Sequence, residues 1–303
     1  MRLKHYRDLK IYKQESITGY LFILPYSIGF LLFQGLPFFL SFIISLTNLR
    51  YVSKLDEVRF VGIGNFTAMI HDKSVIEAML TSLKYCLMYV PLTMMLALLF
   101  ALILNQKVYA RNFLRTLLFM PYVSNIVAVS VIFSILLSPT NGLVNTFLRS
   151  LGVENPPMWL LGTETALPTV VMIACWQQMG MQMVIYLAAL QDVPRELTES
   201  AEIDGANAWQ RFSKIILPVI SPTTFFLTIT TIIGSLKNFS IIQTLTEGGP
   251  GSSTSVLPVS IVRTAFGSFR LGYASAQGMV LFAFVMLITV IQWRGQKKWV
   301  NYM

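Results

Sequence analysis

The sequence predicts an all-α integral membrane protein with six transmembrane helices. Its 303 residues are 54% apolar and 12% charged, with a mean hydropathy of +0.63, which is too apolar for a soluble globular fold. Backbone groups in lipid need internal hydrogen bonds, and the apolar runs lack strict alternation, so we expect helices rather than barrel strands. Six stretches are long enough to cross a bilayer: 17–46, 81–104, 117–137, 167–190, 222–245 and 277–293.

The first of these stretches, 17–46, is expected to be a retained membrane span. It follows five basic residues in the tail 1–16, is longer than the core of a signal peptide, and lacks a clear small-residue cleavage site. Pro25 and Pro37 predict that this helix is kinked or tilted.

The distribution of Lys and Arg predicts the orientation of the spans. Fourteen of these residues lie in the tails 1–16 and 294–303 and the loops 105–116 and 191–221, whereas seven lie in the loops 47–80, 138–166 and 246–276. Since positive charge favours the cytoplasmic side, both termini and the loop 191–221 are expected there, on either side of a membrane domain 17–293.

Several classes of function are disfavoured by the composition. The net charge of +9 is spread over the gaps between apolar runs, which argues against nucleic-acid binding. Cys86 and Cys175 each sit inside an apolar run, and His5 and His71 lie far apart, so no metal site is expected. There is no Walker A motif in the sequence, so ATP, if it is used, is expected to bind to another chain.

The loop 191–221 has the pattern of two short helices joined by a turn. Asp192 is a candidate N-cap, Pro194 suits a first helical turn, and Glu196 suits the positive end of the helix dipole. Gly205 permits a tight turn, after which a second helix would run to Pro218. One apolar stripe is expected across most of the loop, formed by Leu197, Ala201, Ala208 and Phe212. By itself this pattern also fits a connector lying on the membrane surface.

The loop resembles the signature loop of binding-protein-dependent ABC importer permeases. That signature reads Glu-Ala-Ala, then Gly, then Ile-x-Leu-Pro at fixed spacings, and Ser200 here replaces the first Ala. The segment from Leu245 to Pro250 and the segment from Gly272 to Ala276 are similar to those of carbohydrate permeases related to the maltose system. Glycerol-phosphate permeases share these features, so the resemblance fixes the class of transporter more firmly than the substrate.

The resemblance implies a type I ABC importer permease fold with a cytoplasmic coupling helix, in a bacterial cytoplasmic membrane. The importer would contain a second, related permease chain, two ATPase subunits that bind ATP and Mg, and an extracytoplasmic solute-binding protein that delivers a sugar, expected to be an oligo- or disaccharide. This chain would hold no cofactor. The residues implied to couple to an ATPase are Glu199, Ser200, Ala201, Asp204, Gly205, Ala206, Phe212, Leu217 and Pro218.

Polar side chains in the fourth and fifth spans mark a candidate path for the substrate. In maltose-type relatives the substrate is held by the spans on either side of the signature loop, which implicates Gln177, Gln178, Met181, Thr231, Ser235 and Asn238. Gln182 is a further amide in the fourth span that must face something polar. Such groups also hold helices together in membranes, and the sequence leaves both roles open.

Two lysines stand out within the apolar stretches. Lys237, read as lying at mid-helix, either extends toward the outer interface or belongs to the path, because a buried ammonium is costly in lipid. Lys84 is expected to extend to the interface.

Two other functions compete with the importer permease. An autonomous cation-coupled sugar transporter would need carboxylates within the membrane, and the predicted spans contain no Asp or Glu. A membrane enzyme would need a nucleophile with a base, a carboxylate pair or a metal cluster, and the sequence pattern offers none of these.

Overall fold

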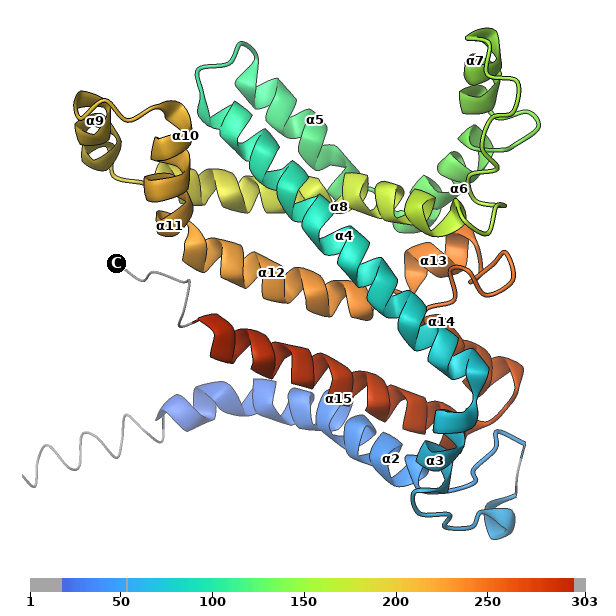
Figure 1. The fold of residues 1–303 in the computed structure, drawn as a ribbon. Coiled ribbons are helices and arrows are strands. Elements are labelled where there is room, and N and C mark those ends of the chain that lie inside the picture. Colours follow the sequence, from blue (N-terminus) through green and yellow to red (C-terminus); the bar gives the residue numbers. More distant parts are fainter. Residues whose placement is uncertain (1–17, 53, 297–303) are drawn as a thin grey trace, which may run out of the picture. The chain divides into compact units, whose positions relative to one another are not determined.

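The computed structural model describes residues 18–52 and 54–296, which are mostly helical (Figure 1). The one β bridge among them joins Thr47 to Phe60. The elements are η1 (Leu31–Gly35), α2 (Leu36–Ser45), η2 (Leu55–Glu57), α3 (Gly64–His71), α4 (Lys73–Asn105), α5 (Arg111–Val123), α6 (Ile126–Leu136), α7 (Leu143–Ser150), α8 (Ala166–Gln191), α9 (Arg195–Ile203), α10 (Ala208–Arg211), η3 (Phe212–Ile216), α11 (Leu217–Val219), α12 (Ser221–Leu236), α13 (Ser240–Leu245), α14 (Leu257–Val262), η4 (Arg263–Gly267) and α15 (Leu271–Gly295).

The chain divides into two compact units. The first lies within Met1–Thr67 and Thr264–Met279, and the second within Ala68–Arg263 and Val280–Met303. The tail 1–16 with its basic residues, and the chain from 297 onward, lie outside the described residues.

The core of the second unit forms where α4 packs against α8 and α12 (Figure 1). α4 buries a stripe of side chains spaced four residues apart, which places them on one face of the helix: Tyr85, Tyr89, Thr93, Ala97 and Ala101. The small Ala97 and Ala101 have no exposed surface and allow α8 to approach closely. The large Tyr85 and Tyr89 rings stack at 5.3 Å between centroids.

Four single helices are long and apolar enough to cross a membrane: Thr18–Ser45, Lys73–Asn105, Ala166–Gln191 and Leu271–Gly295. Two bent pairs bring the number to as many as six, which is the number predicted from the sequence. α4 starts eight residues before the predicted window, because Asp72 caps it by accepting a hydrogen bond from the Ser74 amide at 3.0 Å.

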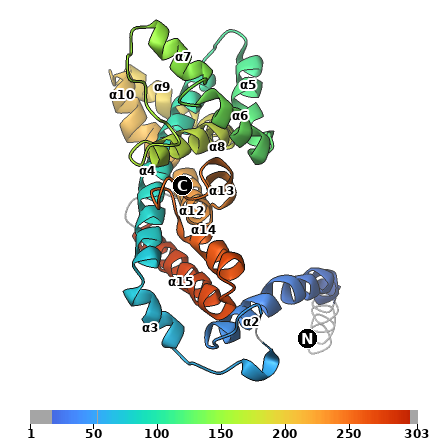
Figure 2. The same cartoon turned by 90° about the vertical axis from the view of Figure 1, so that its right-hand side faces the viewer.

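The third predicted span, 117–137, is not a straight helix. α5 and α6 meet at 99° (Figure 2). Pro121 lies in the last turn of α5, Ser124 is extended, and the Asn125 side chain accepts hydrogen bonds from the Val127 and Ala128 amides to start α6. The break therefore uses a proline and a capping asparagine inside an otherwise apolar run.

The fifth predicted span, 222–245, is also interrupted. α12 ends at Leu236, Lys237 is its C-cap, and α13 begins at Ser240. At its other end α12 meets the preceding helical segment, Ala208–Val219, at 67°.

In the first unit, the helix Thr18–Ser45 contains the π-helical turn η1 just before Pro37. A π turn at this place accommodates a proline that cannot donate a backbone hydrogen bond. The loop that follows is tied to the start of α15, because the Gly272 amide donates to the Leu49 carbonyl at 2.8 Å. Gly272 is required at this contact, since a Cβ atom there would collide with the Thr47 carbonyl oxygen.

Candidate functional site

The segment that connects α8 to α12, residues 192–220, carries the predicted coupling residues, and we call it the Gly205 loop. The sequence pattern predicted that Asp192 caps the first helix of this loop, and this prediction is wrong. Asp192 is the C-cap of α8 with helical dihedral angles, and Pro194 occupies the N-cap position of α9 without a side-chain hydrogen bond. The reason is that α8 continues to Gln191, and Pro194 then disfavours helical geometry in the residue before it.

Gly205 forms the turn between α9 and α10, as expected. Its φ is +79°, a value that a residue with a side chain rarely adopts. The Gly205 amide donates to the Glu202 carbonyl at 3.1 Å, and the Ala206 amide donates to the Ala201 carbonyl at 2.9 Å, which is the Schellman arrangement of a helix end. Asn207 and Gln210 then form a capping box that starts α10.

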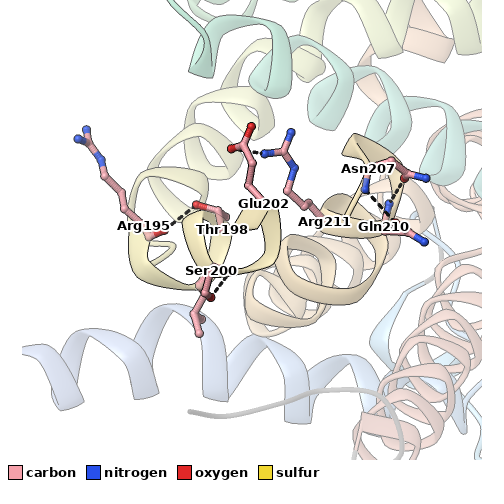
Figure 3. A network of polar contacts seen from close by, with 8 residues as sticks. Arg195, Thr198, Ser200, Glu202, Asn207, Gln210 and Arg211 are labelled. Carbon is pink, nitrogen blue, oxygen red and sulfur yellow. Dashed lines mark hydrogen bonds and ion pairs between the residues drawn. The ribbon is translucent and has the colours of Figure 1, made fainter. Parts of the chain in front are cut away.

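A surface ion pair also joins the two helices of the loop. The Arg211 guanidinium donates to a Glu202 carboxylate oxygen at 2.6 Å (Figure 3). Because 69% of the Glu202 side chain is exposed, the pair contributes little to stability, about 0–1 kcal/mol. The angle between α9 and α10 is thus set mainly by the backbone turn.

The predicted apolar stripe across the loop is wrong. The turn at 204–207 separates Leu197 and Ala201 on α9 from Ala208 and Phe212 beyond it, so they cannot lie on one helix face. The other predicted coupling residues divide by exposure. Glu199, Ser200, Asp204, Gly205 and Leu217 are exposed, whereas Ala201, Ala206, Phe212 and Pro218 are half-buried.

Two apolar residues that the sequence reasoning did not select dominate the surface of the loop. Ile203 is 87% exposed and Trp209 is 71% exposed, one on each side of the Gly205 turn. The Trp209 ring lies 5.6 Å from the ring of Phe212, which is half-buried beneath it. The signal in the sequence was a large apolar residue on each side of a glycine in an otherwise polar segment.

A cavity of about 320 Å³ lies among α4, α8 and α12 and holds many of the predicted path residues. Four of the six predicted side chains line it, namely Gln178, Met181, Thr231 and Asn238. The rest of its lining is Tyr89, Gln182, Ile185, Phe226, Leu227, Thr230 and Gly234. None of these lining residues carries a formal charge, so the cavity is a mixture of amides, hydroxyls and apolar side chains.

Gln182 is the most informative residue of this cavity. Only 4% of it is exposed, and its Nε2 donates to the Thr231 Oγ1 at 2.7 Å. Its Oε1 is buried without a hydrogen-bond partner among the described residues. A buried acceptor left without a donor costs about 1–3 kcal/mol.

The two remaining predicted path residues lie elsewhere. Gln177 is directed toward the break between α5 and α6, where its Nε2 donates to the Ser124 carbonyl at 3.4 Å. Ser235 is 3% exposed and donates to the Ile232 carbonyl of its own helix.

Asn238 belongs both to the cavity lining and to a contact between helices. It lines the cavity, and its Nδ2 also donates to the Tyr85 hydroxyl at 2.9 Å, which ties the end of α12 to α4. The tyrosine pair of α4 was not selected from the sequence, although its spacing of four residues within an apolar run was visible there.

Lys237 does not lie at mid-helix, contrary to the sequence-based expectation. It is the exposed C-cap of α12, where the negative end of the helix dipole favours a cation. Lys84 is also exposed and lines a second cavity of about 600 Å³ near the start of α4, together with Glu77 and Glu164.

No group of three or more His, Cys, Asp or Glu residues that could hold a metal ion occurs in the described part of the chain. Both cysteines are buried and free of disulfides. The Cys175 sulfur lies 3.0 Å from the Thr93 hydroxyl, so it contributes to packing between α8 and α4.

Comparison with known proteins gives a consistent family assignment. The profile of the family described as "Binding-protein-dependent transport system inner membrane component" matches residues 60–293. A probable ABC transporter permease protein, YesP of Bacillus subtilis, is 32% identical over 96% of this chain and 94% of its own length. The sn-glycerol-3-phosphate transport system permease protein UgpA of Agrobacterium fabrum is 32% identical over 80% of this chain and 83% of its own.

Solved structures share the fold. A chain of a bacterial alginate ABC transporter, crystallised with an alginate pentasaccharide-bound periplasmic protein, superposes with a TM-score of 0.82. The match covers 94% of this chain and 96% of that one at 24% identity, so the similarity concerns the architecture.

Proposed function

Because the chain belongs to the family of binding-protein-dependent transport system inner membrane components, we propose that its cavity passes a neutral carbohydrate and that its Gly205 loop docks on a separate ATPase subunit. A chain of this family is an inner-membrane, multi-pass permease of an ABC importer and has no ATPase site of its own. The importer then contains the ATPase subunits, a second permease chain and an extracytoplasmic binding protein that delivers the sugar.

The single observation that carries the substrate proposal is the uncharged lining of the cavity. Sugars offer hydroxyl groups to amides and hydroxyls and a weakly polar face to aromatic rings, and the cavity supplies both through Gln178, Gln182 and Tyr89. A volume of about 320 Å³ is at the lower end of the range of ligand pockets, roughly 300–1,000 Å³.

Glycerol 3-phosphate is the second candidate substrate, because the UgpA relatives are named for its transport. A phosphate dianion in a low-dielectric site needs a nearby cation. Lys237, exposed at the end of α12, is not part of the cavity lining. The neutral lining therefore favours a sugar over a phosphate ester.

The docking proposal rests on the shape of the Gly205 loop. α9 presents the Glu199 carboxylate and the Ile203 side chain on an exposed short helix, and the carboxylate has no hydrogen-bond or ion-pair partner among the described residues. A charged group beside an exposed apolar anchor is suited to a groove of a soluble partner. The Lys and Arg distribution supports a cytoplasmic position for this loop.

Both parts of the proposal are tested in membrane vesicles that contain the chain with its genomic partners. Uptake of labelled neutral oligosaccharides and of glycerol 3-phosphate would be compared with and without ATP inside the vesicles. A cysteine at Ile203 should form crosslinks with an ATPase subunit, and a cysteine at Leu143, which begins α7 and is 69% exposed, serves as the control. ATP-independent uptake driven by an ion gradient would instead establish the cation-coupled alternative.

A further inference from the structure

A third, strongly polar cavity includes residues from the start of the Gly205 loop, and the proposed transport function does not use it. Its volume is about 560 Å³, and we call it the arginine cavity. Its polar lining comes from Asn105 at the end of α4, Arg111 at the start of α5, Gln191 at the end of α8, and Arg195 and Thr198 of α9. Four different helices therefore contribute to one hollow.

The two arginines of this cavity have no counter-ion within it. Neither guanidinium makes a hydrogen bond or an ion pair with another of the described residues, and no carboxylate belongs to the lining. Asp192 and Glu196 lie nearby in the sequence, but both are exposed and outside the lining. In Figure 3 the Arg195 side chain extends away from the pair formed by Glu202 and Arg211. Arg111 is half-buried, and a partly desolvated cation favours an anion in contact with it.

The chemistry of the lining fits a phosphate group. A guanidinium presents parallel N–H donors that match two oxygens of a phosphate, and two arginines can hold one phosphate from two sides. The amide nitrogens of Asn105 and Gln191 supply further donors for the remaining oxygens, whereas the Thr198 hydroxyl already donates to the Arg195 carbonyl at 2.9 Å.

The position of the cavity is at the end of the membrane-spanning helices. Asn105 and Gln191 are the last residues of α4 and α8, two helices that are long and apolar enough to span a bilayer. Tyr109 and Phe113, which flank Arg111, are 95% and 68% exposed. Exposed aromatic residues at the end of a span are typical of the headgroup region, and basic pockets between helices on the cytoplasmic side bind anionic headgroups.

We propose that the arginine cavity binds a phosphate group, presented by an anionic phospholipid headgroup or as free phosphate. Arg195 is the first residue of α9, so a bound phosphate also holds the start of the helix that carries Glu199 and Ile203. This consequence for coupling rests on the proposed function, whereas the binding itself does not.

Binding is measured on the purified full-length chain in detergent. Native mass spectrometry gives the affinity for phosphatidylglycerol and for phosphatidylcholine, and equilibrium dialysis gives the affinity for inorganic phosphate. Arg111→Gln and Arg195→Gln are compared with Arg115→Gln, which removes the same charge from an exposed position of α5 outside the lining. Arg111→Lys keeps the charge but not the two parallel donors.

If the bound phosphate belongs to a lipid headgroup, the wild-type chain binds phosphatidylglycerol more tightly than phosphatidylcholine. Each Arg→Gln change in the cavity then weakens the binding of phosphatidylglycerol roughly fivefold. For a free anion, the same variants weaken binding of inorganic phosphate, and no preference between the two lipids is seen. In both cases Arg115→Gln has no effect, and Arg111→Lys lies between wild type and Arg111→Gln.

The proposal is overturned if neither ligand responds to Arg111→Gln or Arg195→Gln, or if Arg115→Gln weakens binding as much as they do. Elution of each variant as the same monodisperse species as the wild type shows that it is folded. If one cavity variant does not fold, the other carries the comparison, since they lie on separate helices.

Discussion

Gln182 of α8 donates a hydrogen bond of 2.7 Å to Thr231 of α12, which leaves its carbonyl oxygen without a partner among the described residues. One side chain thus holds two helices together and belongs to the lining of the cavity, with its Oε1 atom buried. The sequence offered helix contact and substrate contact as alternatives, and the structure places this amide both at a helix contact and in the lining of the cavity.

Replacing Gln182 by Leu is expected to raise the KM for uptake up to roughly tenfold, because one hydrogen bond to a substrate hydroxyl is worth about 0.5–1.5 kcal/mol. The measurement is initial uptake rate against sugar concentration, corrected for protein abundance. Gln277→Leu is the matched control, since Gln277 is also buried, donates through Nε2 to Thr264 and has an Oε1 without a partner among the described residues, but lies outside the cavity. An equal rise of KM in both variants would contradict a specific role for Gln182.

Replacing Ile203 by Glu is expected to abolish uptake while the chain still reaches the membrane, because the change places a carboxylate at the exposed apolar residue of the proposed docking face. Co-purification of the ATPase subunit is the direct measurement. Leu143→Glu, at a residue exposed to 69% on α7, is the control. Retention of the ATPase by Ile203→Glu would exclude docking through this face of α9.

Replacing Glu199 by Lys is expected to uncouple ATP hydrolysis from uptake, because under the proposed docking the reversed charge would repel a basic residue on the ATPase subunit. Glu196→Lys makes the same change on the same helix, one turn away and also exposed, and is expected to transport normally. Normal uptake in the Glu199→Lys variant would count against the docking orientation.

Replacing Gly205 by Ala is expected to destabilise the turn by about 1 kcal/mol, because φ of +79° is strained for any residue with a Cβ. No heavy atom lies within 4 Å of the added Cβ, so strain alone causes the effect. Hydrogen exchange of the Ala206 amide, which closes the turn, should accelerate. Gly205→Asn should exchange more slowly than Gly205→Ala, since Asn tolerates this conformation better.

Replacing Gly180 by Ala is expected to destabilise the protein by about 1–3 kcal/mol through overpacking, because the added methyl group collides with the Leu118 carbonyl of α5. Gly278→Ala in α15, where nothing lies within 4 Å, should be neutral or slightly stabilising, since Ala favours helix more than Gly does. Thermal unfolding of both variants in detergent distinguishes the two effects.

The positions of the long helices followed from composition. The fourth span was expected at 167–190 and is α8 at Ala166–Gln191, because an uninterrupted apolar run of bilayer length has no alternative structure in lipid. The Gly205 turn was also visible, since only glycine readily adopts positive φ at the end of a helix.

The helix breaks were not predictable in the same way. Ser124 and Asn125 separate α5 from α6, and Lys237 ends α12. Both places lie within stretches that are apolar enough to continue as helices. At such a place either the helix continues or a side chain caps its end. Which of the two happens depends on what packs around the segment, and a local pattern does not contain that information.

The sequence alone determined that this chain crosses a membrane repeatedly, which family its Gly205 loop resembles, and that polar groups occur in the fourth and fifth spans. Only the tertiary structure decided which of those groups meet. Gln177 and Gln178 are consecutive, and consecutive residues of a helix point about 100° apart, so the rotation of α8 selects one of them for the cavity. The contact of Gly180 with Leu118 of α5 fixes that rotation, because α8 can approach α5 only on the face that lacks a side chain.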